Sequence, residues 1–274
     1  AEPGSGRKPA ILSTLAALLS FCCAAWEVHS HHGSRLLDPW VSWFEADALD
    51  AVPMVFFTAL TLLLLALAPK RDAGGRALAG MLLLAASTEV AYAASNLVTL
   101  AAGWWLTCVP FAFSFFGHPP AKRVVSIFLI ASASALTAGI VALHATGLSD
   151  FSHISHLAMW MVILAVALRK GLFPVHSWVV TSFEHGPLLP ASLLFNGHLG
   201  ALLIARSEAV SLPDFAHQML DMLGIAALIT ALIASLRSFA EKKPRRLLAF
   251  VCISQASFIL AGLATANAEG ITGS

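Results

Sequence analysis

The chain is dominated by long apolar runs that are separated by short polar segments. A helix that spans the hydrocarbon core of a membrane needs about 20 mostly apolar residues. The runs of that length predict membrane helices over residues 10–28, 48–68, 77–96, 97–117, 122–144, 188–206, 217–240 and 245–266. A further stretch, 154–186, is longer and interrupted, and it predicts one crossing made of two half-helices. The pattern therefore predicts an all-α, polytopic membrane helix bundle with about nine crossings.

Composition supports a membrane protein. Apolar residues make up 58% of the 274 residues and charged residues only 11%, whereas a soluble domain has about 45–50% and about 25%. This balance excludes a soluble enzyme and a disordered chain. The net charge of +1 provides no basic surface for a nucleic acid. The four cysteines lie in apolar runs without CxxC spacing, so we expect buried thiols and no metal site in this chain.

The lysines and arginines predict the orientation. If the N-terminus is cytoplasmic, the loops on that side carry twelve of the 16 basic residues: Arg7, Lys8, Lys70, Arg71, Arg76, Lys122, Arg123, Arg237, Lys242, Lys243, Arg245 and Arg246. The opposite loops carry Arg35 and Arg206. This bias matches the positive-inside rule only if 154–186 crosses once. We therefore predict a multi-pass protein of the bacterial inner membrane with a cytoplasmic N-terminus.

The interrupted segment 154–186 carries the strongest functional signal. Gly171 and Pro174 lie near its centre and disrupt the helical hydrogen-bond ladder. Arg169 and Lys170 stand beside this break, and a charge at membrane depth is usually functional because it is costly to insert. These features favour an ion pathway. In an alternative interpretation, 171–187 is a cytoplasmic loop and the two cations cap a helix. With that loop, the segments rich in lysine and arginine would no longer all fall on the same side of the membrane.

Further polar residues cluster around the break: His176, Glu184, His185, Asn196 and His198. Histidine titrates near neutral pH and suits a proton relay. Each of Asn196 and His198 could instead form a simple helix–helix hydrogen bond, and Glu184 with His185 fits a solvated pair at the membrane edge. Beside a buried cation, Asn196 and His198 together favour the relay.

Three local patterns resemble one family. NLVTLAAGW, from Asn96 to Trp104, is similar to its N-L-x-x-x-x-x-G-W-E helix start. RKGLFPVHSW, from Arg169, resembles its P-x-H-x-W break and is followed by Gly186 and Pro187. RRLLAFVCISQ, from Arg245, is similar to K-R-x-L-A-Y-S-x-x-S-Q. The family comprises the proton-conducting, antiporter-like membrane subunits of respiratory complex I, Mrp-type antiporters and bacterial inorganic-carbon accumulation complexes.

The resemblance implies a single membrane domain over 1–274 with an incomplete inverted repeat. Residues 10–68 would be leading helices, 77–206 the first five-helix repeat, and 217–274 the start of a second. It also implies an ion-conducting, energy-coupling role within a larger complex. No nucleophile–base pair, phosphate loop or metal-ligand spacing predicts an active site or a cofactor of the chain's own.

The chain departs from the family at the proton path. The family's Glu after Gly-Trp is Trp105 here, and the family's buried Lys, five residues before the Pro, is Arg169, with Lys170 following. Arginine does not lose its proton in proteins, so we expect Lys170 to carry any proton transfer. Glu89 or Glu184 could replace the missing carboxylate beside Lys170, or a chain through Asn196 and His198 could serve it.

The run after Trp178, from Val179 to Phe183, is closest to DabB-type subunits. Those subunits pair with DabA, a zinc protein related to β-carbonic anhydrases, and the resemblance implies that zinc belongs to such a partner. The chain's own His29, His31 and His32 fit a solvated loop better than a metal site. The alternatives are an antiporter-like subunit of a complex I or Mrp-type complex, and a non-conducting scaffold that anchors a partner.

Overall fold

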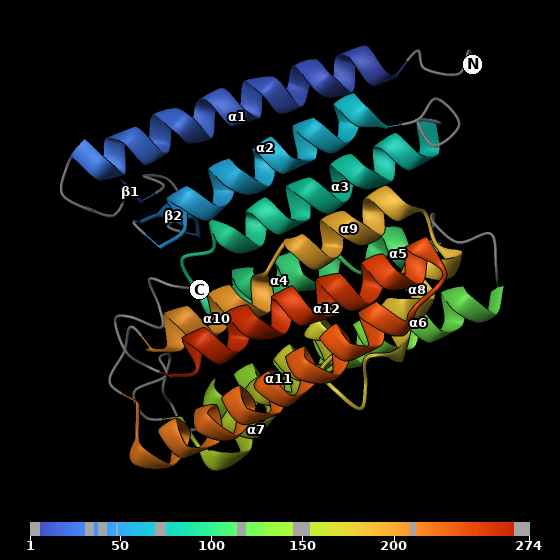
Figure 1. Cartoon of the computed structure of the whole chain (residues 1–274). Coiled ribbons are helices and arrows are strands. Elements are labelled where there is room, and N and C mark those ends of the chain that lie inside the picture. The colour runs from blue at the N-terminus through green and yellow to red at the C-terminus, as the bar shows by residue number, and fades with distance from the viewer. Residues whose placement is uncertain are drawn as a thin grey trace. The chain divides into compact units, whose positions relative to one another are not determined.

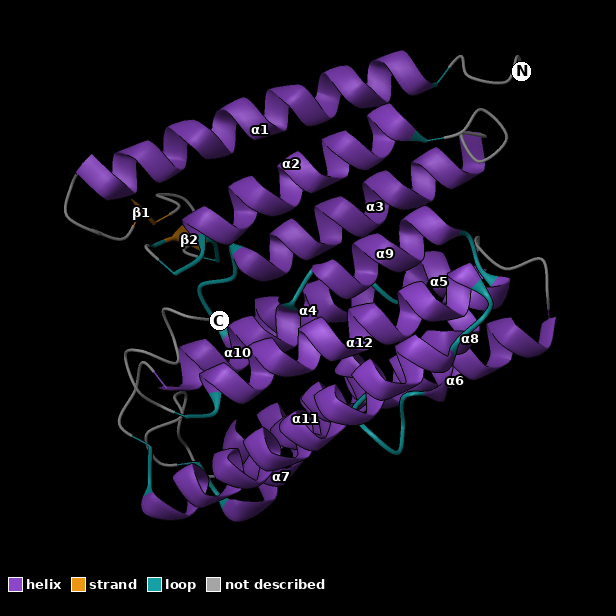
Figure 2. Ribbon diagram, viewed as in Figure 1, coloured by secondary structure: helices purple, strands orange, loops and turns teal. Residues whose placement is uncertain are grey.

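The computed structural model describes residues 6–30, 36–37, 43–47, 49–68, 75–113, 119–144, 154–208 and 212–265. These residues are almost entirely helical (Figure 2). The helices are α1 (Arg7–Ser30), α2 (Ala51–Leu67), α3 (Gly75–Tyr92), α4 (Leu97–Leu106), α5 (Val109–Phe113), α6 (Pro119–His144), α7 (His156–Lys170), α8 (Ser177–His185), α9 (Leu188–Asn196), α10 (Leu199–Glu208), α11 (Asp214–Ala240) and α12 (Pro244–Leu263). Strands β1 (Leu36–Leu37) and β2 (Glu45–Ala46) form one short antiparallel pair.

The described residues form two compact units, 1–116 with 187–197 and 117–186 with 198–274. In the first unit, α1 packs on α2, and α3 packs on α2, α4 and α9 (Figure 1). Asn96 begins α4, because its side chain accepts a hydrogen bond from the amide of Thr99 at 2.8 Å. That a single membrane domain covers 1–274 stays a prediction.

The second unit is a bundle around α7. Helices α6, α10, α11 and α12 all contact α7, and α8 packs on α6 and α12. Ser155 begins α7 by accepting a hydrogen bond from the amide of Ala158 at 3.2 Å. Pro244 stands at the first position of α12, where its missing N–H has no helical partner to lose. α7 therefore contacts four other helices of this unit, and its last two residues, Arg169 and Lys170, are buried.

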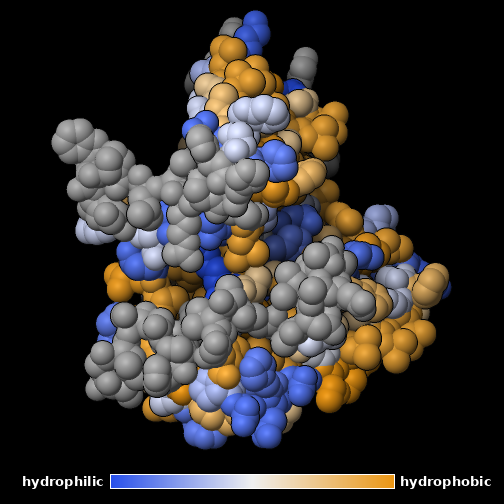
Figure 3. Space-filling view, turned by 90° about the vertical axis from the view of Figure 1, so that its left-hand side faces the viewer, coloured by the Kyte–Doolittle hydropathy of each residue, from blue (hydrophilic) through white to orange (hydrophobic). Residues whose placement is uncertain are grey.

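The predicted all-α membrane character is confirmed. Five helical segments in the described residues are long and apolar enough to cross a membrane: Arg7–Ser30, Pro119–His144, Leu188–Ser207, Asp214–Ala240 and Pro244–Leu263. Shorter apolar helices cover Ala51–Leu67, Ala77–Tyr92 and Leu97–Phe111. On the face drawn in Figure 3, hydrophobic residues form broad exposed areas. Phe239 of α11 is 90% exposed, as expected where lipid rather than water surrounds a helix.

Two predicted spans are not continuous helices. The run 97–117 divides into α4 and α5 around a turn at Thr107 and Cys108, because Pro110 has no amide proton and its ring clashes with the carbonyl one turn earlier. The run 188–206 divides into α9 and α10 at Gly197 and His198. The sequence did not predict this second division. It falls at His198, which is a residue of the predicted proton path.

Candidate functional site: two interrupted helices around Lys170

The first interruption separates α7 from α8. α7 ends at Lys170, and Gly171 has a left-handed backbone with φ of 63°. The amide of Leu172 donates to the carbonyl of Ala167 at 3.0 Å, and the amide of Gly171 donates to the carbonyl of Leu168 at 3.3 Å. This pair of bonds is a Schellman arrangement, which ends a helix and satisfies its last carbonyls.

Side chains satisfy the remaining backbone groups at this break. The indole of Trp178 donates to the carbonyl of Leu168 at 2.9 Å. The amide of Phe173 donates to the hydroxyl oxygen of Thr230, on α11, at 3.0 Å. Irregular backbone at membrane depth is tolerated only where the protein meets its hydrogen-bonding needs. Trp178 and Thr230 therefore let the chain leave the helix inside the bundle.

We predict that Thr230→Val destabilises the protein. Thr230 is 2% exposed, and without its hydroxyl the buried amide of Phe173 loses its partner, at a cost of about 1–3 kcal/mol. The thermal unfolding midpoint in detergent should fall. The matched control is Thr61→Val, because Thr61 is equally buried and its hydroxyl donates to its own helix, at the carbonyl of Phe57. Equal midpoints for the two variants would contradict the assigned role.

The second interruption separates α9 from α10. His198 has a φ of 40°, in the left-handed region where histidine is tolerated better than most residues. The amide of Ala201 donates to the carbonyl of His198 at 2.8 Å rather than continuing the ladder of α9. The phenol of Tyr92 donates to the carbonyl of Gly197. His198 therefore stands immediately before α10, and its carbonyl accepts the first hydrogen bonds of that helix.

The two interruptions bring together a lysine and a histidine. Lys170 Nζ lies 2.8 Å from His198 Nδ1, and Lys170 is 3% exposed. At this distance one nitrogen donates to the other, and the tautomer of the imidazole decides which. Both groups can gain and lose a proton. The contact is therefore chemically able to pass a proton between α7 and α10.

Gly200, one residue into α10, makes room for the lysine. A Cβ atom at Gly200 would lie 3.6 Å from Cγ and 3.7 Å from Cε of Lys170, and 3.1 Å from Cγ1 of Val166. The stem of Lys170 thus lies directly against the backbone of α10. This close approach directs Nζ towards His198.

The structure places the other predicted site residues as follows. Arg169 is 5% exposed in the last turn of α7, where a helix C-terminus stabilises cations. His176 stacks on Phe173 with ring centroids 5.4 Å apart, and its Nδ1 is buried without a hydrogen-bond partner among the described residues. Asn196 is exposed and donates to the carbonyl of Ser192 at 2.8 Å.

The two carboxylates considered as partners of Lys170 contact other groups. Glu184 Oε1 lies 2.7 Å from Lys243 Nζ, and Arg246, which also contacts Glu241 at 3.1 Å, lies 3.9 Å from Glu184. These ion pairs join the end of α8 to the start of α12. Glu89 belongs to the first unit, and its Oε1 lies 2.7 Å from the hydroxyl of Thr58. That either carboxylate serves Lys170 stays a prediction.

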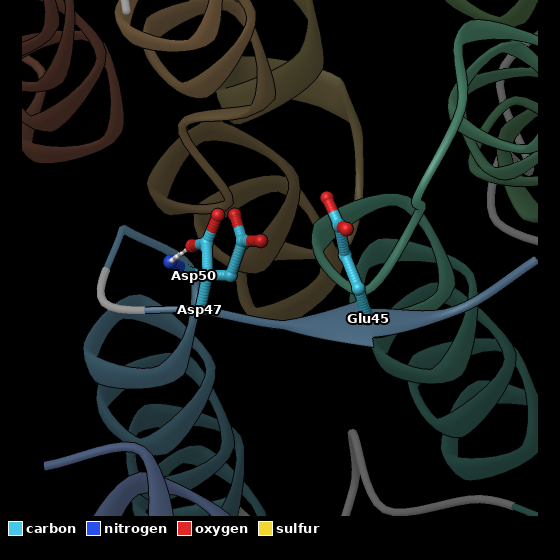
Figure 4. Close-up of side chains that lie close together, drawn as sticks. All are labelled: Glu45, Asp47 and Asp50. Atoms are coloured by element: carbon cyan, nitrogen blue, oxygen red, sulfur yellow. Dashed lines mark hydrogen bonds between the residues drawn. The ribbon is translucent and has the colours of Figure 1, made fainter. Parts of the chain in front are cut away.

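A cluster of three acidic side chains lies in the first unit, near the start of α2. Glu45, Asp47 and Asp50 lie close together (Figure 4), with ligand atoms within 4.8 Å of one another. Asp47 Oδ1 already accepts hydrogen bonds from the amides of Leu49 and Asp50, at 2.8 and 3.1 Å. The turn before α2 thus accounts for the position of Asp47. His29 is exposed at the end of α1, and its neighbours His31 and His32 lie outside the described residues.

Sequence reasoning missed Thr230, Tyr92 and Gly200. Each acts through a tertiary contact with a segment far away in the sequence, so local patterns gave no signal for it. A polar residue inside an apolar run, such as Thr230 in α11, is the trace that could have drawn attention to it.

Comparisons with known proteins show the family of the chain. Residues 121–274 match the family described as NADH:quinone oxidoreductase/Mrp antiporter, TM. A NAD(P)H-quinone oxidoreductase chain 4 of Synechococcus elongatus is 26% identical over 220 residues, which cover 70% of this chain and 40% of that relative. NADH-quinone oxidoreductase subunit N of Thermobifida fusca is 29% identical over 117 residues, 41% of this chain and 21% of the relative. The matches thus span less than half of these relatives' own length.

Solved structures share the fold. A chain of the Mrp complex from a Dietzia species has a TM-score of 0.77 and 22% identity, covering 95% of this chain and 55% of its own length. A chain of respiratory complex I from Thermus thermophilus has a TM-score of 0.78 and 22% identity, covering 97% and 62%. At this identity the likeness concerns the fold alone.

Proposed function

We propose that this chain, which belongs to the NADH:quinone oxidoreductase/Mrp antiporter family of membrane proteins, is a proton-conducting, energy-coupling subunit of a larger complex. The observation that carries the proposal is the 2.8 Å contact between Lys170 Nζ and His198 Nδ1. Two groups that can exchange a proton meet at the point where two helices are interrupted. A purely structural bundle has no need for this arrangement, which is costly to bury.

In the proposed mechanism, a proton passes between Lys170 and His198. It then moves from this pair to another polar side chain of the path. Donation by the ammonium to a neutral imidazole gives a neutral amine and an imidazolium, and the reverse step restores Lys170. Arg169 keeps its charge throughout, so it acts as a fixed positive charge beside the exchanging pair. His176 lies beyond the α7–α8 break, and we propose that it extends the path towards α12.

The proposal is tested by His198→Asn. Asparagine keeps a hydrogen-bonding side chain and tolerates the left-handed backbone, but it does not titrate. In vesicles containing the whole complex, proton flux followed by a pH-sensitive dye should fall by about tenfold or more. The control is His144→Asn, because Nδ1 of His144 contacts its own helix at the carbonyl of Ile140. Unchanged flux in His198→Asn would overturn the role of His198.

Other subunits are proposed as partners. The similar proteins are named as chains of NAD(P)H-quinone oxidoreductases and of Mrp and respiratory complexes, which supports assembly of this chain into a comparable complex. We also propose that the complex lies in the bacterial inner membrane with the N-terminus cytoplasmic. The support is the bias of lysines and arginines, among them Arg7 and Lys8.

A narrower hypothesis is a DabB-type subunit that powers inorganic-carbon uptake together with a zinc-binding DabA-like partner. Its support is the short run from Val179 to Phe183. A neighbouring gene for a zinc protein, and zinc that copurifies with the complex in proportion to this chain, would favour it. A neighbouring set of oxidoreductase or antiporter genes would instead favour a complex I or Mrp-type role.

One observation favours a non-conducting scaffold as the second candidate. Trp105 occupies the position of the family's glutamate. An indole side chain supplies no carboxylate to pair with a buried lysine. If flux in the wild-type complex equals flux in the Lys170 and His198 variants, the scaffold becomes the better description.

A further inference from the structure

A cavity of about 480 Å³ lies within the first unit, and neither Lys170 nor His198 is among its lining residues. Residues of α1, α2 and α3 line it, together with Phe44 of the segment before α2, and it is partly open to its surroundings. Small-molecule sites have volumes of about 300–1,000 Å³. The cavity is therefore large enough to hold an organic ligand.

Its walls are apolar, and one side is fixed by backbone bonds. Small side chains on α3, such as Ala85 and Ala86, and Ala17 on α1 open the space. Phe44 is held beside the end of α3 by two backbone interactions. The backbone amide of Glu45 donates to the carbonyl of Ala93 at 2.8 Å, and a β-bridge pairs Phe44 with Ala94. Aromatic rings such as Phe44 favour contact with organic cations.

One carboxylate faces this apolar space. Glu89 lines the cavity, and its Oε2 is buried without a hydrogen-bond partner among the described residues. Its Oε1 lies 2.7 Å from the hydroxyl of Thr58, which also lies 2.8 Å from the carbonyl of Met54. A hydroxyl has one proton and can serve only one of these acceptors. A carboxylate so weakly satisfied in apolar surroundings needs a proton or a cation.

The surroundings of Glu89 exclude two kinds of cationic ligand. A Mg²⁺ or Ca²⁺ ion is bound by six or more oxygens, several of them charged carboxylates or carbonyls, whereas Glu89 is the single charged group among the described residues that line the cavity. A zwitterionic phospholipid headgroup brings a phosphate, but no lysine or arginine is among the described residues that line the cavity. One carboxylate in an apolar cavity is matched in charge and in polarity by one amine on an apolar body.

We infer that this cavity binds an amphiphile that carries one protonated amine on an apolar chain, with the amine on Glu89 Oε2 and the chain along α1 and α3. Charge complementarity fixes the head, and van der Waals contact with the apolar wall places the chain. Neither Lys170 nor His198 lines the cavity, and amine binding is measured without proton flux, so the inference can fail while the proposed proton conduction stands, and the reverse.

The test is equilibrium binding of radiolabelled dodecylamine to the purified complex in phosphatidylcholine nanodiscs. We expect saturable binding that dodecanol does not displace. Glu89→Gln should weaken binding by about tenfold or more, as a lost charged hydrogen bond implies. Ala85→Phe should fill the cavity and abolish binding, whereas Ala79→Phe on the same helix should not, because Ala79 is exposed and does not line the cavity.

Three outcomes would overturn the inference. Equal displacement by dodecanol and unchanged binding in Glu89→Gln would mean that any apolar chain fills the space. Unchanged binding in Ala85→Phe would place the amine elsewhere. Displacement of dodecylamine by phosphatidylethanolamine added to the nanodiscs would identify a lipid headgroup, rather than a free amine, as the source.

Discussion

We expect Lys170→Arg to reduce proton flux to the background of empty vesicles, as fully as Lys170→Ala does. Arginine keeps a positive charge at the end of α7 but does not release its proton. The site is also narrow, because a Cβ atom at Gly200 would lie 3.7 Å from Lys170 Cε. Flux is measured in vesicles that contain the whole complex, with a pH-sensitive dye and an imposed gradient.

Two controls separate loss of proton transfer from loss of the fold. Lys242→Arg makes the same exchange at an exposed position and should keep full flux. Lys170→Gln removes the charge with little change in size, and it should assemble normally yet conduct nothing. If Lys170→Arg conducts at the wild-type rate, the site needs only a fixed charge, and proton exchange at Lys170 is wrong.

We expect Gly171→Ala to cause the largest loss of stability among single substitutions at the break. The left-handed backbone costs a residue with a side chain about 1–2 kcal/mol. The new Cβ atom would also lie 2.5 Å from Cγ2 of Val179, and overpacking of this kind costs about 1–3 kcal/mol. The thermal unfolding midpoint in detergent should fall clearly, and flux should fall with it because α7 no longer ends at Lys170.

The control is Gly75→Ala, where an added Cβ atom meets nothing within 4 Å and the midpoint should hardly change. A double variant, Gly171→Ala with Val179→Ala, should relieve the steric clash but not the backbone strain, so the two substitutions should not be additive. A Gly171→Ala protein as stable as the wild type would show that the left-handed turn is not required.

The resemblance to the family rested on residues that the structure shows at helix boundaries. Asn96 caps α4, and Arg245 and Arg246 lie in the first turn of α12. The start of a helix restricts which residues can stand there. A short sequence pattern can therefore identify such a position. The match over residues 121–274 confirms the family. The DabB-type relationship and the incomplete repeat stay predictions.

The sequence by itself determined the features that depend on local chemistry. Apolar runs of sufficient length specify membrane helices, so the helical class followed from composition and spacing. Gly171 and Pro174 indicated an interruption because one favours a left-handed turn and the other lacks an amide proton. α7 ends and α8 begins on either side of them.

Only the tertiary structure decided which polar groups meet. Lys170 and His198 are 28 residues apart and touch because two helices are interrupted beside each other. No local rule predicted the second interruption, since the left-handed conformation of His198 depends on its surroundings rather than on its own preference. The same holds for Thr230 beside the amide of Phe173 and for Glu89 beside Thr58. Pairings of this kind depend on how helices pack, which a single sequence does not encode in any short window.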